Sequence, residues 1–150
     1  MIKQISVKTK FGWVSAFEKN DKIFKVKFGK HKNKSASKNL KNFIINLNDF
    51  LQGKSKFFKS NFLIGGNSMQ KKVWRELKKI KFGKTKTYGQ IAKKYKLSPR
   101  HVGKICGQNK LVLSIPCHRV IKSDGSLGGF TSIGGVILKK KLLEFEQSWK

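Results

Sequence analysis

The first third of the chain alternates between apolar and polar residues with the period of two that is typical of β-strands. Two such segments, residues 11–17 and 22–28, flank Asn20-Asp21, a pair that favours a tight hairpin turn. Residues 2–8 form a third candidate strand. The alternation predicts a small antiparallel sheet. The core-facing side chains expected in the segment after the turn are Phe24, Val26 and Phe28.

The pattern then changes to the spacing of an amphipathic helix. Apolar residues recur every three or four positions between Ser37 and Gln52, and Gly53 is a typical helix stop. Residues 57–62 are rich in phenylalanine and predict one more strand, whereas the Gly-Gly-Asn run at residues 65–67 predicts a linker. The apolar helix positions are Leu40, Phe43, Ile44, Leu47 and Leu51.

The second half of the chain has the pattern of several short helices. Ser68 is a candidate N-cap for the first helix, and Ser98-Pro99 is a start signal for a later one, because Ser caps and Pro fits the first helical position. Residues 111–115 predict a short buried strand or extended segment, and residues 137–149 predict a terminal helix. Two helices joined by a tight turn and followed by extended elements predict a winged helix-turn-helix.

We therefore predict an α+β protein with two domains. Residues 1–64 would form a small antiparallel sheet with one helix, and residues 65–150 a helix-rich winged domain. The chain has 150 residues, two cysteines, no signal-like N-terminus and no long apolar run. These features favour a reduced, cytoplasmic protein without a membrane segment.

The formal charge of +28 is extreme and would attract polyanions such as DNA. The charge comes almost entirely from lysine and is spread over both halves of the chain. Enrichment in Lys, Asn and Ile is also typical of an AT-rich genome. The total charge is therefore compatible with DNA binding without being specific for it.

The adjacent pair Cys117-His118 has the composition of an activated nucleophile. A free thiol is mostly protonated at neutral pH, and a neighbouring base or positive charge increases its reactivity. An isolated Cys-His pair more often has a structural role, as a small apolar Cys at a strand end with a solvated His. The flanking residues change this interpretation.

The run from Pro116 to Val120 resembles the active-site signature of the O6-alkylguanine-DNA alkyltransferases, DNA-repair proteins also called methylated-DNA–protein-cysteine methyltransferases. The similarity continues in the family's order over about half of the chain. The other matching stretches are residues 69–74, 87–92, 100–103, Asn109 and residues 142–146.

The resemblance implies a ribonuclease-H-like first domain that gives structural support and a second domain that binds DNA and carries the reaction. Cys117 would accept the alkyl group, His118 would take the thiol proton through a water molecule, and Glu146 would orient His118. This relay follows the logic of a nucleophile, a base and an orienting group. Alkyl transfer would then consume the protein, because S-alkylcysteine is stable.

The resemblance also assigns residues to the substrate. Tyr88 would donate a hydrogen bond to guanine N3, Asn109 would brace the active-site turn, and Lys139 would lie near the pocket. Arg100 would be a finger that replaces the flipped nucleotide in the base stack. The DNA-binding residues would further include Thr87, Tyr88, His101, Gly103, Lys104 and Arg119. The base pocket would comprise Val120, Phe130, Thr131 and Ser132, with Thr131 or Ser132 supplying the N–H near guanine O6.

We expect double-stranded DNA containing O6-alkylguanine as the partner, with no cofactor, no membrane, no obligate protein partner and a monomeric state. We expect no metal site, because residues 1–64 lack Cys and contain only His31. Two alternatives stay open: an alkyltransferase-like protein that binds the damaged base without transfer, and a winged-helix transcription regulator. Without the resemblance, Tyr88 would be interpreted as a core residue, and Arg100 and Glu146 as surface helix residues.

Overall fold

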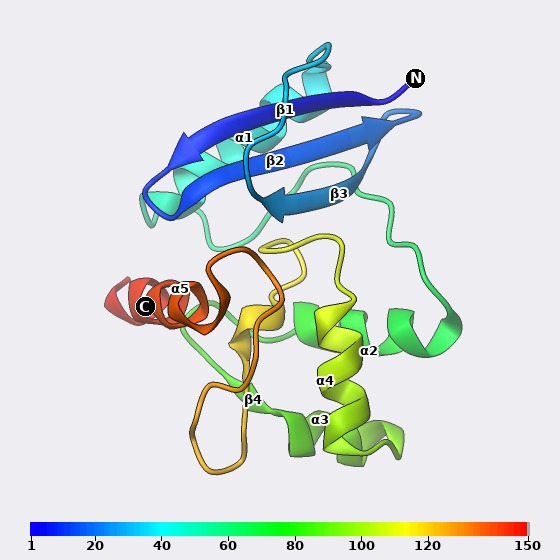
Figure 1. Cartoon of the computed structure of the whole chain (residues 1–150), viewed down its shortest axis with the longest axis vertical. Helices are drawn as coiled ribbons and strands as arrows, with labels where there is room; N and C mark the ends of the chain where they lie inside the picture. Colours follow the sequence, from blue (N-terminus) through cyan, green and yellow to red (C-terminus); the bar gives the residue numbers. More distant parts are fainter. Residues whose placement is uncertain (150) are drawn as a thin grey trace. The chain divides into compact units, whose positions relative to one another are not determined.

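The structure is a computed structural model that describes residues 1–149, and it combines short strands with α-helices (Figure 1). The strands are β1 (Lys3–Thr9), β2 (Gly12–Lys19), β3 (Lys22–Phe28), β4 (Lys86–Thr87) and β5 (Val120–Ile121). The helices are α1 (Lys38–Leu51), α2 (Ser68–Lys78), α3 (Tyr88–Tyr95), α4 (Pro99–Gly107) and α5 (Gly135–Ser148), with a 3-10 turn η1 (Cys117–Arg119). This mixture confirms the predicted α+β class.

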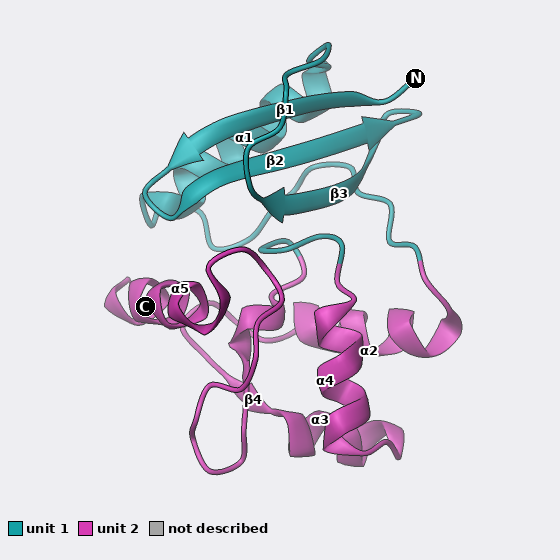
Figure 2. Ribbon diagram, viewed as in Figure 1, with its two compact units in different colours: residues 1–65, 110–114 teal, residues 66–109, 115–150 magenta. Residues whose placement is uncertain are grey.

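The chain forms two compact units, which have different colours in Figure 2. Unit 1 contains residues 1–65 and 110–114, and unit 2 contains residues 66–109 and 115–150. Within unit 1, the returning segment binds β3: the Val26 amide donates to the Lys110 carbonyl over 2.8 Å, and the Val112 amide donates to the Val26 carbonyl over 3.2 Å. Residues 110–114 thus belong to unit 1, whereas the chain directly before and after them belongs to unit 2.

The sheet of unit 1 is antiparallel, as predicted, and its strand order is β1-β2-β3. Asn20 and Asp21 form the β2–β3 turn with φ values of 52° and 61°. Two successive left-handed residues match the twist of a two-residue hairpin, and Asn and Asp tolerate this conformation better than most residues. The predicted hairpin is therefore confirmed.

The expectation for the buried face of β3 was wrong at one position. Opposite the consecutive residues Phe17 and Glu18 lie Lys25 and Ile23, so Phe24 is an extra, bulged residue. A bulge reverses the in-and-out alternation of the strand. Ile23 is consequently buried together with Val26 and Phe28, whereas Phe24 is only half-buried.

Helix α1 covers one face of this sheet (Figure 1) and has the predicted bounds within one residue. Its first turn is capped by the Ser37 hydroxyl, which accepts from the Leu40 amide over 3.1 Å. After its C-cap the chain turns at Gly53, where φ is 74°. The helix buries Leu40, Phe43, Leu47 and Phe50.

The strand expected at residues 57–62 does not form; in this segment only Phe62 makes a bridge, to Ile23. Side chains of α1 bind the backbone of the segment instead. Asn46 donates to the Phe57 carbonyl and accepts from the Lys59 amide, over 3.0 and 2.8 Å. Because these polar groups are satisfied by side chains, the segment needs no strand partner.

In unit 2, each of the helices α2, α3 and α4 begins at a side-chain cap. Asn67, and not the expected Ser68, caps α2 by accepting from the Gln70 amide over 2.8 Å. Thr87 caps α3, and Ser98 caps α4 with Pro99 at the first helical position, as predicted. Each helix among the described residues is too short or too polar to cross a membrane.

Candidate active site

Cys117 lies where the backbone turns twice in succession. Pro116 has φ −80° and ψ 65°, and the Cys117 amide donates to the Ile115 carbonyl over 2.8 Å, which is the geometry of an inverse γ-turn. The Arg119 amide then donates to the Pro116 carbonyl over 3.0 Å and starts the 3-10 turn. Proline favours this path because its ring restricts φ.

Two short pairings connect this turn to the rest of unit 2. Strand β5 pairs in parallel with β4, with Lys86 opposite Val120, so that α3 starts beside the Cys117 turn. The Asn109 side-chain amide donates to the Ile115 carbonyl over 2.8 Å. This hydrogen bond links the residue after α4 to the active-site turn, on either side of residues 110–114.

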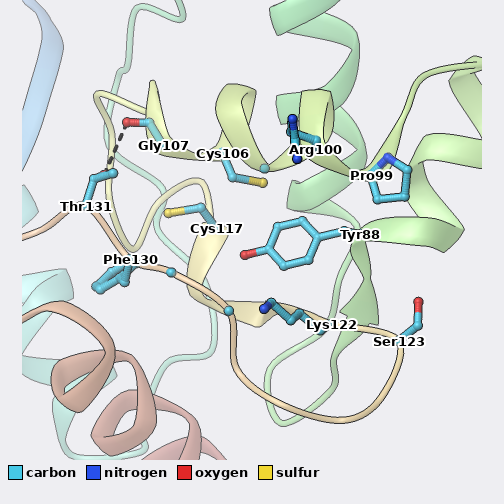
Figure 3. Close-up of a pocket in the computed structure, with 13 residues that line it drawn as sticks. Tyr88, Pro99, Arg100, Cys106, Gly107, Cys117, Lys122, Ser123, Phe130 and Thr131 are labelled. Atoms are coloured by element: carbon cyan, nitrogen blue, oxygen red, sulfur yellow. Dashed lines mark hydrogen bonds between the residues drawn. The ribbon is translucent and has the colours of Figure 1, made fainter.

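A cavity of about 670 Å³ opens beside the Cys117 thiol (Figure 3). This volume is typical of a site for one small organic group such as a base. Its walls come from α3, α4, the Cys117 turn and the loop at residues 122–131. Its lining residues include Tyr88, Arg100, Cys106, Cys117, Phe130 and Thr131.

The Cys117 side chain is buried, and burial raises the pKa of its thiol. The Asn109 hydrogen bond and the Lys139 charge act in the opposite direction. Because a buried thiolate lacks hydration, the resting group is a thiol and needs a base to react at neutral pH.

His118 and Arg119 both point to Glu146 of α5, within the interior of unit 2. His118 Nε2 lies 2.6 Å from Glu146 Oε2, and Arg119 donates from Nε to Oε1 over 2.7 Å and from Nη2 to Oε2 over 3.0 Å. All three residues are at most 5% exposed. The predicted His118–Glu146 contact is therefore present in the structure.

Charge and burial determine the protonation of this group. Burial by itself would raise the Glu146 pKa, but the hydrogen bonds from His118 and Arg119 and the charge of Arg119 outweigh it and lower the pKa to about 2. Burial lowers the pKa of His118, against the opposing effect of Glu146. A neutral His118 that donates from Nε2 to Glu146 has an unprotonated Nδ1 that can take a proton.

Lys139 and Tyr88 form a second polar pair beside the cavity. Lys139 is fully buried, and its ammonium donates to the Tyr88 hydroxyl over 3.2 Å and to the Gly129 carbonyl over 3.3 Å. Burial lowers the pKa of Lys139 and raises that of Tyr88 to about 12. Tyr88 therefore keeps its proton as a hydrogen-bond donor. Gly128, at φ 74°, lets the loop approach the Tyr88 ring, since a Cβ there would lie 3.0 Å from it.

The remaining predicted residues divide between the surface and the cavity. On α4, Arg100, His101 and Lys104 are exposed, and Gly103 lines the cavity with Arg100. Phe130 and Thr131 line it as well, and the Thr131 hydroxyl donates to the Gly107 carbonyl over 3.2 Å (Figure 3).

Other predicted residues lie elsewhere. Val120 is fully buried in β5, and neither Val120 nor Ser132 is among the described residues that line the cavity. Thr87 caps α3. The expectation that Arg119 lies on the DNA-binding surface was wrong. Its guanidinium is buried and donates hydrogen bonds to Glu146 and, over 2.7 Å, to the Ile80 carbonyl.

Sequence reasoning missed Cys106 as part of the cavity wall, because a small residue on a helix gives no sign in the sequence that it faces a cavity. It also missed the loop residues Lys122 and Ser123. No sequence signal marked these loop residues, because only the fold turns the loop back toward the thiol. Among residues 1–149, no group of three or more metal-binding side chains comes together.

Comparison with known proteins gives consistent matches over this part of the chain. A family model described as the DNA-binding domain of 6-O-methylguanine DNA methyltransferase matches residues 68–148. A Sulfolobus acidocaldarius protein named methylated-DNA–protein-cysteine methyltransferase is 44% identical over 98 residues, which cover 65% of this chain and 61% of that protein. A protein of the same name from Metallosphaera sedula is 35% identical over 99% of this chain and 95% of its own length.

Solved structures agree with these matches over the whole chain. The crystal structure of a Mycobacterium tuberculosis O6-methylguanine methyltransferase has a TM-score of 0.88 at 25% identity, covering 100% of this chain and 95% of that chain. A structure of the Mycobacterium tuberculosis protein in complex with DNA has a TM-score of 0.85 at 25% identity, covering 97% and 93% of the two chains.

Proposed function

The chain belongs to the 6-O-methylguanine DNA methyltransferase family, and on that premise we propose that it repairs duplex DNA by moving the alkyl group of O6-alkylguanine to its own Cys117. The observation that carries the proposal is the Cys117 thiol, which lines a cavity of about 670 Å³ while the next residue, His118, is bound to a buried Glu146. The cavity is large enough for a nucleobase. A thiol beside it, with a proton acceptor and a group that orients this acceptor, can perform a displacement at carbon.

The proposed reaction has one displacement step. His118 takes the proton of the Cys117 thiol through a water molecule, and the resulting thiolate attacks the alkyl carbon. The S–C bond forms while the C–O6 bond breaks. The guanine leaves as an anion and takes up the proton that the thiol gave to His118, so that His118 is neutral again. Tyr88, which burial keeps protonated, donates to guanine N3 and stabilises the charge that develops on the base. No step needs a redox or nucleotide cofactor, and the alkylated protein is spent.

We further propose that α3, the turn at Lys96 and α4 form the helix-turn-helix of a winged domain that reads DNA. Lys96 has a left-handed φ of 56°, which gives a tight turn between the two helices. The exposed cations of α4, Arg100 and Lys104, are available to DNA, with Arg100 at the rim of the cavity as the finger for the flipped nucleotide. Unit 1 then acts as a ribonuclease-H-like support.

The test uses intact protein and a duplex with a single O6-methylguanine. We expect a stoichiometric gain of one methylene equivalent, with guanine restored in the DNA. Trypsin separates the two cysteines, since Cys106 lies in residues 105–110 and Cys117 in residues 111–119. The gain should fall on the second peptide alone.

Two matched variants control this experiment. Cys117→Ser should lose all transfer and keep its DNA affinity, whereas Cys106→Ser, which changes the other thiol of the same cavity, should keep transfer. Lesion binding without transfer by the unsubstituted protein would contradict the proposal and favour a damaged-base binding protein. Neither transfer nor lesion preference would favour a DNA-binding regulator.

A further inference from the structure

Arg119 makes a planar, two-bond contact with a carboxylate inside unit 2. Its guanidinium binds both oxygens of Glu146, at 2.7 and 3.0 Å, and the Ile80 carbonyl at 2.7 Å. The guanidinium carbon also lies 5.8 Å from the centre of the Phe82 ring. The two parallel N–H groups of arginine match a carboxylate in a way that lysine cannot reproduce. This contact holds Glu146 in one orientation.

The charges of this cluster balance only when His118 is neutral. Glu146 carries one negative charge and Arg119 one positive charge, and both are buried. Oε2 of Glu146 accepts from Arg119 and lies 2.6 Å from His118 Nε2. Without Arg119, a buried carboxylate with a neutral histidine would be a net anion in a low-dielectric interior, which is costly. The Glu146–His118 pair would then bind one more proton.

The position of that extra proton does not change its consequence. If it lies on His118, the imidazole is charged and Nδ1 carries a hydrogen. If it lies on Glu146, the carboxyl donates to Nε2, and the neutral ring carries its hydrogen on Nδ1. In both states Nδ1 cannot take the proton of Cys117.

We propose that Arg119 is a positioning residue of alkyl transfer, which neutralises Glu146 and thereby keeps His118 Nδ1 free to act as the base. This inference rests on the proposed function, because it assigns a role within that reaction. Arg119 is thus buried and does not act at the protein surface, although it belongs to the same five-residue signature as Cys117.

Other groups around the cluster do not replace Arg119. From α5, the Lys139 ammonium acts on His118 and Cys117, but its hydrogen bonds go to Tyr88 and Gly129. The turn after α2 brings the uncharged Phe82 ring and two backbone groups to the cluster, the Ile80 carbonyl and the Gly83 amide, which donates to Glu146 Oε1 over 3.4 Å. Within the described residues, the other buried carboxylate bound by several cations, Glu76, has its own partners.

The test is the pH dependence of the single-turnover rate of alkyl transfer. In the unsubstituted protein the rate should fall only below the ordinary histidine range, because burial lowers the His118 pKa. In Arg119→Met the acid limb, the pH range in which the rate falls with acidification, should move up by about one to two pH units. The rate at neutral pH should then be lower by up to about 10-fold and should recover toward the unsubstituted rate at each higher pH. The double variant Arg119→Met with Glu146→Gln removes both charges. Its rate should be low, but its acid limb should return to lower pH.

A merely structural role for Arg119 predicts something different: a lower melting temperature and a rate reduced by the same factor at every pH. That result would overturn the inference, as would an acid limb that stays shifted in the double variant. If Arg119→Met does not fold, Arg119→Gln carries the test. Its amide keeps a hydrogen-bond donor for Glu146 without the charge, so the limb should move up as in Arg119→Met, and an unmoved limb overturns the inference.

Failure of the proposed function is a separate result. In that case the unsubstituted protein transfers no alkyl group at any pH. The inference fails when the unsubstituted protein transfers the alkyl group and the Arg119 variants leave the pH profile unchanged.

Discussion

Unit 2 contains two buried carboxylates that are alike in pKa and different in surroundings. Lys94 is the main cause that lowers the Glu76 pKa to about 2, and the Glu146 pKa is also about 2. Glu76 binds Lys79, Lys86 and Lys94, whose side chains are 65%, 43% and 52% exposed. The partners of Glu146 are His118 and Arg119, whose side chains are 1% and 6% exposed.

The difference shows how one kind of contact can serve stability at one place and chemistry at another. Glu76 lies on α2, and its lysines reach it from the C-cap of α2, from β4 and from α3. They connect these elements, and water can replace any one of them. Around Glu146 no such replacement exists, because every partner is buried. Each charge there determines where the protons of its neighbours lie.

The largest effect should come from removing the Glu146 charge. Glu146→Gln leaves the buried Arg119 without a counter-charge, so we expect a loss of about 3 kcal/mol in unfolding free energy. Loss of the histidine's orienting group should also reduce the transfer rate by about 100-fold. The matched control is Glu144→Gln on the same helix, whose side chain is 64% exposed and should have little effect on either quantity. Equal effects of the two substitutions would contradict the assignment.

Acid should destabilise the protein through both carboxylates. Their pKa values of about 2 lie below the ordinary value of 4.5, so the unfolded chain binds protons first as the pH falls. The stabilisation is complete above about pH 4.5 and is lost toward pH 2. Urea unfolding followed by tryptophan fluorescence should show a loss of about 2 to 4 kcal/mol between pH 5 and 2. A flat profile would mean that neither carboxylate is paired in solution.

Glu76→Gln should separate stability from chemistry. We expect a loss of about 1 to 2 kcal/mol at neutral pH, because three exposed lysines and the Tyr95 hydroxyl lose a charged acceptor. The transfer rate of the folded variant should stay within about twofold of the unsubstituted rate. Its acid-induced loss of stability should also be smaller. A large fall in rate would place Glu76 in the reaction and remove the contrast with Glu146.

The smallest effect should come from a single lysine of the Glu76 cluster. Lys79→Ala should cost about 0.5 kcal/mol or less, since the contact at 3.3 Å is solvent-exposed and two other lysines remain. Thermal unfolding at low and at moderate salt measures this. A loss of several kcal/mol would show that the cluster is not screened by water.

What the sequence determined by itself was the set of features that depend on neighbouring residues. The hairpin at Asn20-Asp21, the bounds of α1 and the start of α4 at Ser98 follow from turn, capping and spacing preferences over a few positions. The same applies to the pairing of a thiol with an adjacent histidine. The link to Glu146 came from the resemblance, because 28 residues separate it from His118.

The tertiary structure alone decided the features that depend on partners distant in sequence. The bulge at Phe24 reversed the burial pattern of β3, and asparagines of α1 replaced the strand expected at residues 57–62. Arg119 is the clearest case, since a charged residue beside a DNA-repair cysteine is expected at the surface. Burial became favourable only because α5 brings Glu146 and the turn after α2 brings the Ile80 carbonyl within hydrogen-bond distance of its guanidinium.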